Sequence, residues 1–143
     1  MSDDIYRILD ANFNRLREAL RVVEEYFRFI IENEDACVAL KRMRHQLADM
    51  EKNIGQDALL QGRDTASDCF ATESRPEEMD RSNAADVKTA NFKRAQEACR
   101  VIEEYSKATG AAQVSQTAKE IRFSLYALQK SAEPAYVISS DKI

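Results

Sequence analysis

The sequence has few of the residues that interrupt helices, with only three glycines and two prolines among 143 residues. Hydrophobic residues make up 44% of the chain and charged residues 32%. This composition is too apolar for a disordered protein and is typical of a helical globular one. The length suits one domain that can bury a core. We therefore expect a single all-α domain, with no strand before residue 130.

Cysteine and histidine are also scarce. Cys37, Cys69 and Cys99 are widely spaced and form no C-x-x-C pair, and His45 is the only histidine. We therefore expect no zinc site and no disulfide framework, but reduced thiols with Cys99 in the core. The glycine-rich phosphate-binding loops and the H-E-x-x-H motif are missing as well. His45 is expected to be a partly exposed helix residue.

The chain has neither an excess of positive charge nor a long hydrophobic run. Its formal net charge is -4 and its pI is near 5.2, which argues against a nucleic-acid partner. No segment approaches the roughly 18 apolar residues of a membrane span, and the first residues are acidic where a signal peptide would be basic. We expect a soluble, cytoplasmic protein without a membrane partner.

One segment occurs twice in the chain, at an offset of 79 residues. Residues 11–26 read ANFNRLREALRVVEEY and residues 90–105 read ANFKRAQEACRVIEEY, with 11 of 16 positions identical. Apolar positions vary between the copies, as Leu16 and Ala95 do, whereas most charged positions do not. Core packing tolerates swaps of similar shape and does not explain retained charges. Both faces of each repeated helix therefore have a use.

Apolar spacing predicts four long helices arranged as two hairpins. Steps of three and four define a core stripe at Phe13, Leu16, Leu20, Val23, Phe27 and Ile30. Similar seams run through residues 36–54 and 114–132. We predict an all-α four-helix bundle made of two duplicated hairpins, a single pseudo-symmetric domain over residues 1–132. Its parts are repeat 1 at about 6–53, a long central loop at 56–84 and repeat 2 at about 85–132, followed by a tail at 133–143.

The second face of each repeated helix carries groups suited to phosphate and metal. Arginine presents a planar fork of donors that fits phosphate, and grouped carboxylates can hold Mg²⁺. The phosphate candidates are Arg15, Arg94, Arg44, Arg122 and Arg63, and the metal candidates are Glu18, Glu25, Glu97, Glu104 and Asp64. An equally open alternative is that Arg15 with Glu18 and Arg21 with Glu25 form weak intrahelical ion pairs. Glu24 and Glu103, on the outer face, are expected to be solvated.

Three motifs in the same order carry a resemblance to a known family. They read LDANFNRLREALRVVEEY at residues 9–26, RDT at 63–65 and TANFKRAQEACRVIEEY at 89–105. The chain resembles the all-helical hydroxymethylpyrimidine phosphate kinase domain that occurs alone or fused ahead of thiamine phosphate synthase. The resemblance implies Mg²⁺-dependent transfer of the γ-phosphoryl group of ATP to hydroxymethylpyrimidine phosphate, which gives the diphosphate in thiamine biosynthesis.

We assign the candidate residues to roles on this basis. The catalytic candidates are Arg15, Arg94, Arg63 and Asp64. The substrate-binding candidates are Asn12, Asn91, Arg44, Arg122, Tyr26 and Tyr105, with the two asparagines orienting ligand or helix ends. The metal candidates are Glu18, Glu25, Glu97 and Glu104.

Two other functions stay open on the residues alone. All-helical nucleotide pyrophosphohydrolases also line Mg²⁺ with helix carboxylates spaced three and four apart. Alternatively, the chain is a non-catalytic oligomerisation or regulatory module whose second face packs on another subunit, as in a homodimer. The small residues of that face would then allow close approach: Ala19, Val22, Ala98 and Val101.

Overall fold

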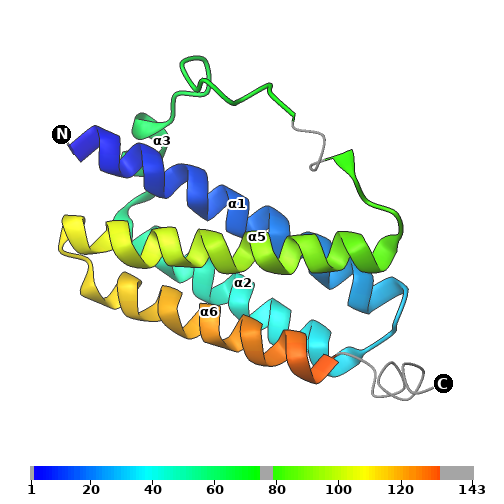
Figure 1. Cartoon of the computed structure of the whole chain (residues 1–143). Helices are drawn as coiled ribbons and strands as arrows, with labels where there is room; N and C mark the ends of the chain where they lie inside the picture. The colour runs from blue at the N-terminus through cyan, green and yellow to red at the C-terminus, as the bar shows by residue number, and fades with distance from the viewer. Residues whose placement is uncertain (1, 75–78, 133–143) are drawn as a thin grey trace.

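The computed structural model describes residues 2–74 and 79–132, and within them it contains five α-helices and no strand (Figure 1). The all-α prediction is therefore confirmed, while the predicted tail at 133–143 lies outside the described residues. The helices are α1 (Ser2–Phe29), α2 (Glu34–Ile54), α3 (Gln56–Gly62), α5 (Ala84–Tyr105) and α6 (Ala112–Ala132), with a short 3-10 helix η1 (Ser106–Thr109) after α5.

The helices begin and end at residues whose chemistry favours those positions. The side chains of Asn33 and Asn83 accept hydrogen bonds from the amides of Ala36 and Asp86, at 3.0 and 2.9 Å, and so cap α2 and α5. Gly55 ends α2 with φ 109° and Gly110 ends η1 with φ 74°, backbone conformations that side chains disfavour. The chain therefore changes direction at both glycines.

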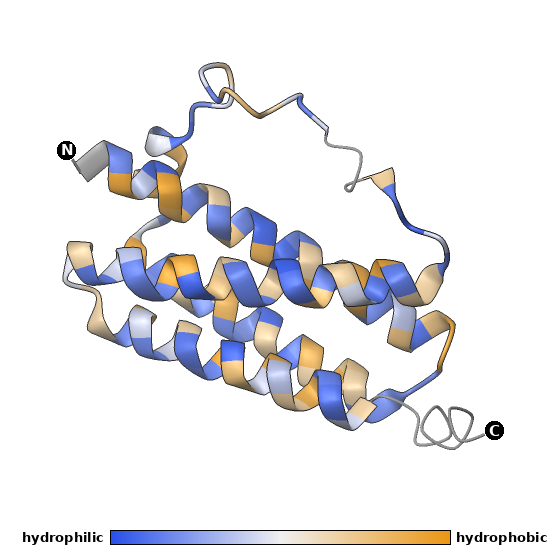
Figure 2. Cartoon of the chain, viewed as in Figure 1, coloured by the Kyte–Doolittle hydropathy of each residue, from blue (hydrophilic) through white to orange (hydrophobic). Residues whose placement is uncertain are grey.

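The four long helices pack side by side (Figure 1). The most extensive contact joins α1 to α5, which run in opposite directions, and further contacts join α5 to α6, α1 to α2 and α2 to α6. Figure 2 shows that each helix carries both hydrophobic and hydrophilic residues along its length, as an amphipathic helix in a packed core must. The origin of the two halves by duplication stays an interpretation of the sequence.

The core follows the stripes that the sequence predicts. In α1 the stripe from Phe13 to Phe27 is buried, whereas Ile30 is 57% exposed because α1 ends at Phe29. Cys99 is fully buried in α5, as expected, and burial raises the pKa of its thiol to about 12. The seam of α6 is buried from Val114 to Leu125. His45 is exposed on α2.

The segment predicted as a loop at 56–84 is only partly irregular. It begins with the seven-residue helix α3, which packs against α1 through Leu59, a residue only 3% exposed. Gly55 separates α3 from α2, so the short helix can turn away and bury that leucine. Leu59 is the one buried apolar side chain of α3, which is too little for a periodic pattern in the sequence.

Candidate functional site

A cavity of about 770 Å³ lies where α1, α5 and the segment after α3 meet. We call it the central cavity. From α1 and α5 it receives matching residues of the two sequence copies, since each has a counterpart 79 positions away. These residues are Asn12, Arg15, Glu18, Ala19 and Val22 from α1, and Asn91, Arg94, Glu97, Ala98 and Val101 from α5.

The packing of α1 on α5 explains why both copies kept the same second face. The helices run antiparallel, so their equivalent faces meet (Figure 1). Ala19 and Ala98 are each 2% exposed, whereas the arginine and glutamate side chains of the lining are exposed. Small residues in the middle leave room between the helices, and the charged side chains surround that space.

The two asparagines of the cavity are held in the same way in both copies. The side-chain amide of Asn12 donates to the carbonyl of Ile8 at 2.9 Å, and that of Asn91 donates to Val87 at 2.8 Å. The Asn12 oxygen also accepts from Arg15 Nη1 at 3.5 Å. Because each side-chain amide donates to a carbonyl one turn earlier in its own helix, each asparagine is fixed in orientation, and its side-chain oxygen is the acceptor that it presents.

Four residues of the segment 63–74 complete the cavity lining and were not predicted from the sequence. They are Asp68, Phe70, Ala71 and Glu73, and Phe70 is the single aromatic residue of the lining, with 59% of it exposed. The carboxylate of Asp68 accepts from the Phe70 amide at 3.0 Å. The length of the loop was the signal that it has a function, but its composition did not indicate which residues face the helices.

Arg63 and Asp64, predicted as catalytic, do not line the central cavity but tie the start of the same segment to α1. Arg63 donates from Nε and Nη2 to the two carboxylate oxygens of Asp10, both at 2.8 Å, and this hydrogen bond raises the pKa of Arg63. The Asp64 carbonyl accepts from Arg7 Nη2 at 2.9 Å. The amide of Ser67 donates to the Asp64 carboxylate, which lowers the pKa of that carboxyl.

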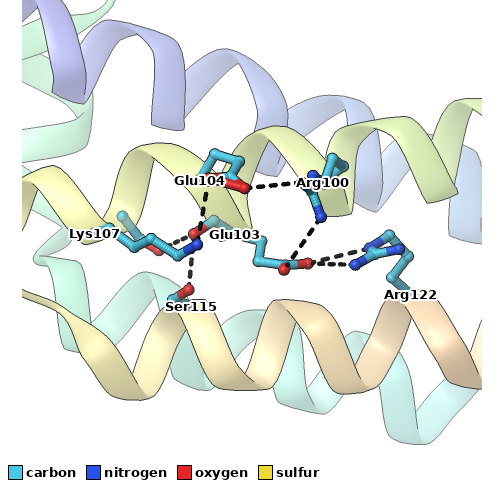
Figure 3. A network of polar contacts seen from close by, with 7 residues as sticks. Arg100, Glu103, Glu104, Lys107, Ser115 and Arg122 are labelled. Carbon is cyan, nitrogen blue, oxygen red and sulfur yellow. Dashed lines mark hydrogen bonds and ion pairs between the residues drawn. The ribbon is translucent and has the colours of Figure 1, made fainter.

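Arg44 and Arg122, predicted to bind substrate, form two equivalent ion pairs outside the central cavity. Arg44 donates from Nε and Nη2 to the two carboxylate oxygens of Glu24, at 2.7 and 3.2 Å. Arg122 donates from Nε and Nη2 to one oxygen of Glu103, at 3.1 and 2.9 Å (Figure 3). Each pair joins one hairpin's two helices, and the hydrogen bond to Glu103 raises the pKa of Arg122.

The expectation that Glu24 and Glu103 are solvated was wrong. Each is only 6% exposed. Helical spacing predicts the position of a residue around its own helix. Whether a carboxylate beside the core face can be buried depends on an arginine from the next helix, which pairs with it. The matching of Arg44 with Arg122 in the sequence was the signal that could have found these pairs.

The remaining predicted residues also lie outside the lining of the central cavity. Glu25 lies 4.0 Å from Arg21, a pair that the ion-pair alternative named. Glu104 pairs with Arg100 at 3.0 Å and with Lys107 at 3.3 Å, which that alternative did not name. The Tyr26 ring packs edge-on against Phe27, and the Lys88 ammonium lies 5.4 Å from its centre. Tyr105, its counterpart, is 41% exposed. The substrate-binding and metal-binding roles of these residues stay predictions.

The carboxylates of the cavity are of the kind that would hold a magnesium ion. Glu18, Glu97, Asp68 and Glu73 supply oxygen ligands, which Mg²⁺ prefers. Among the described residues no three His, Cys, Asp or Glu side chains group closely enough to hold a metal by themselves. Mg²⁺ is commonly bound by one or two carboxylates together with substrate phosphates, rather than by protein ligands alone. The carboxylates of the cavity suit this shared coordination.

A family model matches the sequence over residues 7–131, and it is that of the ThiD2 family. The chain belongs to the ThiD2 family. The three motifs had suggested membership of the hydroxymethylpyrimidine phosphate kinase domain family. That family assignment was wrong, because the matching family is ThiD2. The repeated motif defines the helical domain well, but it does not by itself separate related families of thiamine biosynthesis.

The ThiD2 domain is similar to part of several proteins named thiamine-phosphate synthase. The protein of Thermosynechococcus vestitus is 42% identical over 128 residues, covering 87% of this chain and 34% of the relative. That of Nostoc punctiforme is 38% identical over 127 residues, covering 89% and 35%. The chain thus spans about a third of the length of these relatives. No solved structure matches the ThiD2 domain, and none of its described helices is long and apolar enough to cross a membrane.

Proposed function

We propose that this ThiD2 domain transfers the γ-phosphoryl group of ATP to hydroxymethylpyrimidine phosphate and so forms the diphosphate for thiamine biosynthesis. The observation that carries the proposal is the meeting of Arg15 and Arg94, with Glu18 and Glu97, at one cavity. The volume of about 770 Å³ is within the range of small-molecule sites. The relatives' name points to thiamine phosphate chemistry, and thiamine contains a pyrimidine ring.

The cavity suits an acceptor that is already anionic. A phosphate oxygen of the acceptor attacks the γ-phosphorus, the bond to the β–γ bridging oxygen breaks, and ADP leaves. Because this oxygen carries no proton to remove, positioning and charge neutralisation suffice, and the cavity lining contains no histidine that would act as a base. Arg15 and Arg94 would hold the phosphate oxygens through charge-assisted hydrogen bonds.

Bound Mg²⁺ would neutralise charge on the β- and γ-phosphates. In this chain, one or two of the carboxylates of Glu18, Glu97, Asp68 and Glu73 would hold it. The arginines and carboxylates of the cavity line the same space, so a phosphate group there could meet both a guanidinium and a carboxylate-bound cation. Omission of Mg²⁺ is expected to abolish turnover.

The decisive experiment incubates the purified chain with Mg-ATP and hydroxymethylpyrimidine phosphate and detects the products by mass. We expect the diphosphate and ADP in equal amounts. The free hydroxymethylpyrimidine alcohol is expected to react much more slowly, since an alcohol acceptor needs a base. If neither acceptor is phosphorylated, the proposed function is wrong; if both react equally fast, the explanation of selectivity is wrong.

Single variants test the arginines. Arg94→Ala and Arg15→Ala are each expected to lower kcat/KM on the order of 100-fold, the usual cost of one donor to a developing anion. The matched control is Arg42→Ala, which removes an exposed arginine of α2 that does not line the central cavity. Unchanged turnover in Arg94→Ala, with normal circular dichroism, would remove that residue from the site.

The same product analysis covers the hydrolase alternative, because a pyrophosphohydrolase would release pyrophosphate from the nucleotide without an acceptor. The oligomerisation alternative receives less support. Its small residues, Ala19, Val22, Ala98 and Val101, line the central cavity within one chain. The small residues that would have met another subunit thus face each other across α1 and α5 of one chain.

A further inference from the structure

Three consecutive residues fix the end of α3 to the first turns of α1. Gly62 is buried, and a Cβ there would lie 2.9 Å from the Arg7 nitrogen and 3.0 Å from the Tyr6 carbonyl carbon, so only glycine fits against that backbone. Arg63 then binds Asp10 with both arms of its fork, and the Asp64 carbonyl accepts from Arg7. We call these contacts the loop anchor.

Asp10 is the centre of the loop anchor. Its carboxylate is 7% exposed and takes both hydrogen bonds of Arg63, whose side chain is 44% exposed. A buried carboxylate held by a bidentate arginine fixes geometry as well as charge, because the planar fork fits in one orientation. The position equivalent to Asp10 in the second copy is Thr89, which cannot bind a guanidinium in this way. Within the part of the chain that the structure describes, the anchor therefore belongs to the first copy.

The chain that leaves the loop anchor reaches the central cavity within a few residues. The amide of Ser67 donates to the Asp64 carboxylate at 3.0 Å and closes a turn directly after the anchor. Asp68, Phe70 and Glu73 follow, and all three line the cavity. Figure 1 shows this segment leaving α3 and passing beside α1 toward the start of α5. The position of these three side chains therefore depends on where the anchor holds residue 64.

We propose that Asp10, acting through Arg63, is a positioning residue that sets Phe70 against the aromatic ring of a bound substrate. This inference rests on the proposed function, in which both substrates contain an aromatic ring. Phe70 is the one aromatic side chain of the cavity lining, and stacking on a ring face is the contact that it can supply. Arg63 and Asp64 then serve the site without touching the substrate.

The test compares Asp10→Asn with Phe70→Ala and with the matched control Glu24→Gln. Glu24 is also a buried α1 carboxylate held by a bidentate arginine, but it lies away from the loop. Two experiments are made: one measures hydrogen exchange of the Ser67 and Phe70 amides, and the other measures kcat and KM for both substrates. Asp10→Glu keeps the charge and serves as the rescue variant.

For Asp10→Asn we expect exchange of those two amides to rise at least about tenfold, with unchanged exchange in the middle of α1 and α5, because the anchor loses its ionic pair. KM for one substrate should rise about tenfold, with a smaller change in kcat. Phe70→Ala should raise the same KM without faster exchange of the Ser67 amide, Asp10→Glu should restore part of the effect, and Glu24→Gln should change neither quantity.

Unchanged loop exchange in Asp10→Asn would overturn the anchor, and faster exchange with an unchanged KM would overturn its role for the substrate. A KM that rises equally in Glu24→Gln would also contradict the proposal, since general destabilisation would then explain the effect. If the wild-type chain forms no diphosphate, the proposed function fails, and the exchange measurement alone decides whether Asp10 holds the loop.

Discussion

The ion pair of Arg122 with Glu103 offers a direct test of the site, because Arg122 was predicted to bind substrate and the structure places it beside a buried carboxylate. We expect Arg122→Met to destabilise the chain strongly. Methionine keeps the stem of the arginine but removes both hydrogen bonds, at 2.9 and 3.1 Å, to Glu103. Glu103 would then retain Arg100, whose nitrogen lies 3.6 Å away and whose side chain is 57% exposed (Figure 3).

The size of the effect follows from burial. The Arg122 and Glu103 side chains are 12% and 8% exposed, and breaking a buried pair by removing one partner costs about 3 kcal/mol. Removing both charges costs less, because no uncompensated charge stays behind. The double variant Glu103→Gln/Arg122→Met should therefore lose less free energy of unfolding than the two single variants lose together, by about 1–3 kcal/mol.

Urea unfolding followed by circular dichroism measures these differences. With a slope of about 2 kcal/mol per molar urea, Arg122→Met should lower the midpoint by about 1.5 M. Glu104→Gln is the surface control, since its pairs with Arg100 and Lys107 are exposed and should contribute less than about 1 kcal/mol. If Arg122→Met lowers the free energy of unfolding no more than Glu104→Gln does, this reasoning is refuted. Lost phosphate binding at full stability would restore the substrate role.

Three further predictions concern single positions. Burial raises the pKa of Cys99 to about 12. The neutral thiol therefore contributes fully to the free energy of unfolding below the unfolded-state pKa near 9, and this contribution is lost as pH rises toward 12. Cys99→Ala should therefore reduce the loss of stability at alkaline pH, as measured by urea unfolding. A thiol reagent at pH 8 should modify exposed Cys69 within the native chain but not Cys99. Gly110→Ala should cost about 1 kcal/mol, since only its φ of 74° opposes a side chain, whereas Gly62→Ala, which meets the α1 backbone, should cost more.

The sequence predicted most of the fold because its signals are local. The spacing of apolar residues placed the core of α1, α2 and α6, and the caps at Asn33, Gly55 and Gly110 are residue types that favour helix ends. These features depend on residues a few positions apart. The missed helix α3 is only seven residues long, and a single buried leucine decides its position, so periodicity had too few residues to indicate it.

The site was predictable where the two copies could be compared. Six candidates, Asn12, Arg15, Glu18 and their counterparts, do line one cavity, and the retained polar residues were the reason to select them. Arg44, Arg122, Arg63 and Asp64 were selected by residue type, which does not show what an arginine or aspartate contacts. Their partners come from other elements or from turns. The matching of Arg44 with Arg122 was a sequence signal for the pairs with Glu24 and Glu103, whereas the contacts of Asp10 and Ser67 had none.

The central cavity combines a symmetric lining with an asymmetric loop, and this difference bears on how two unlike substrates could share it. The α1 and α5 residues offer each half of the cavity the same asparagine, arginine and glutamate, which suits two phosphate-bearing ligands meeting in the middle. Asp68, Phe70 and Glu73 break that equivalence, because Asp10 anchors their loop to the first copy whereas Thr89 stands at the matching position in the second. If the loop decides which half receives which substrate, Arg15→Ala and Arg94→Ala should raise the KM of different substrates. Equal effects on both would show that the two halves act alike.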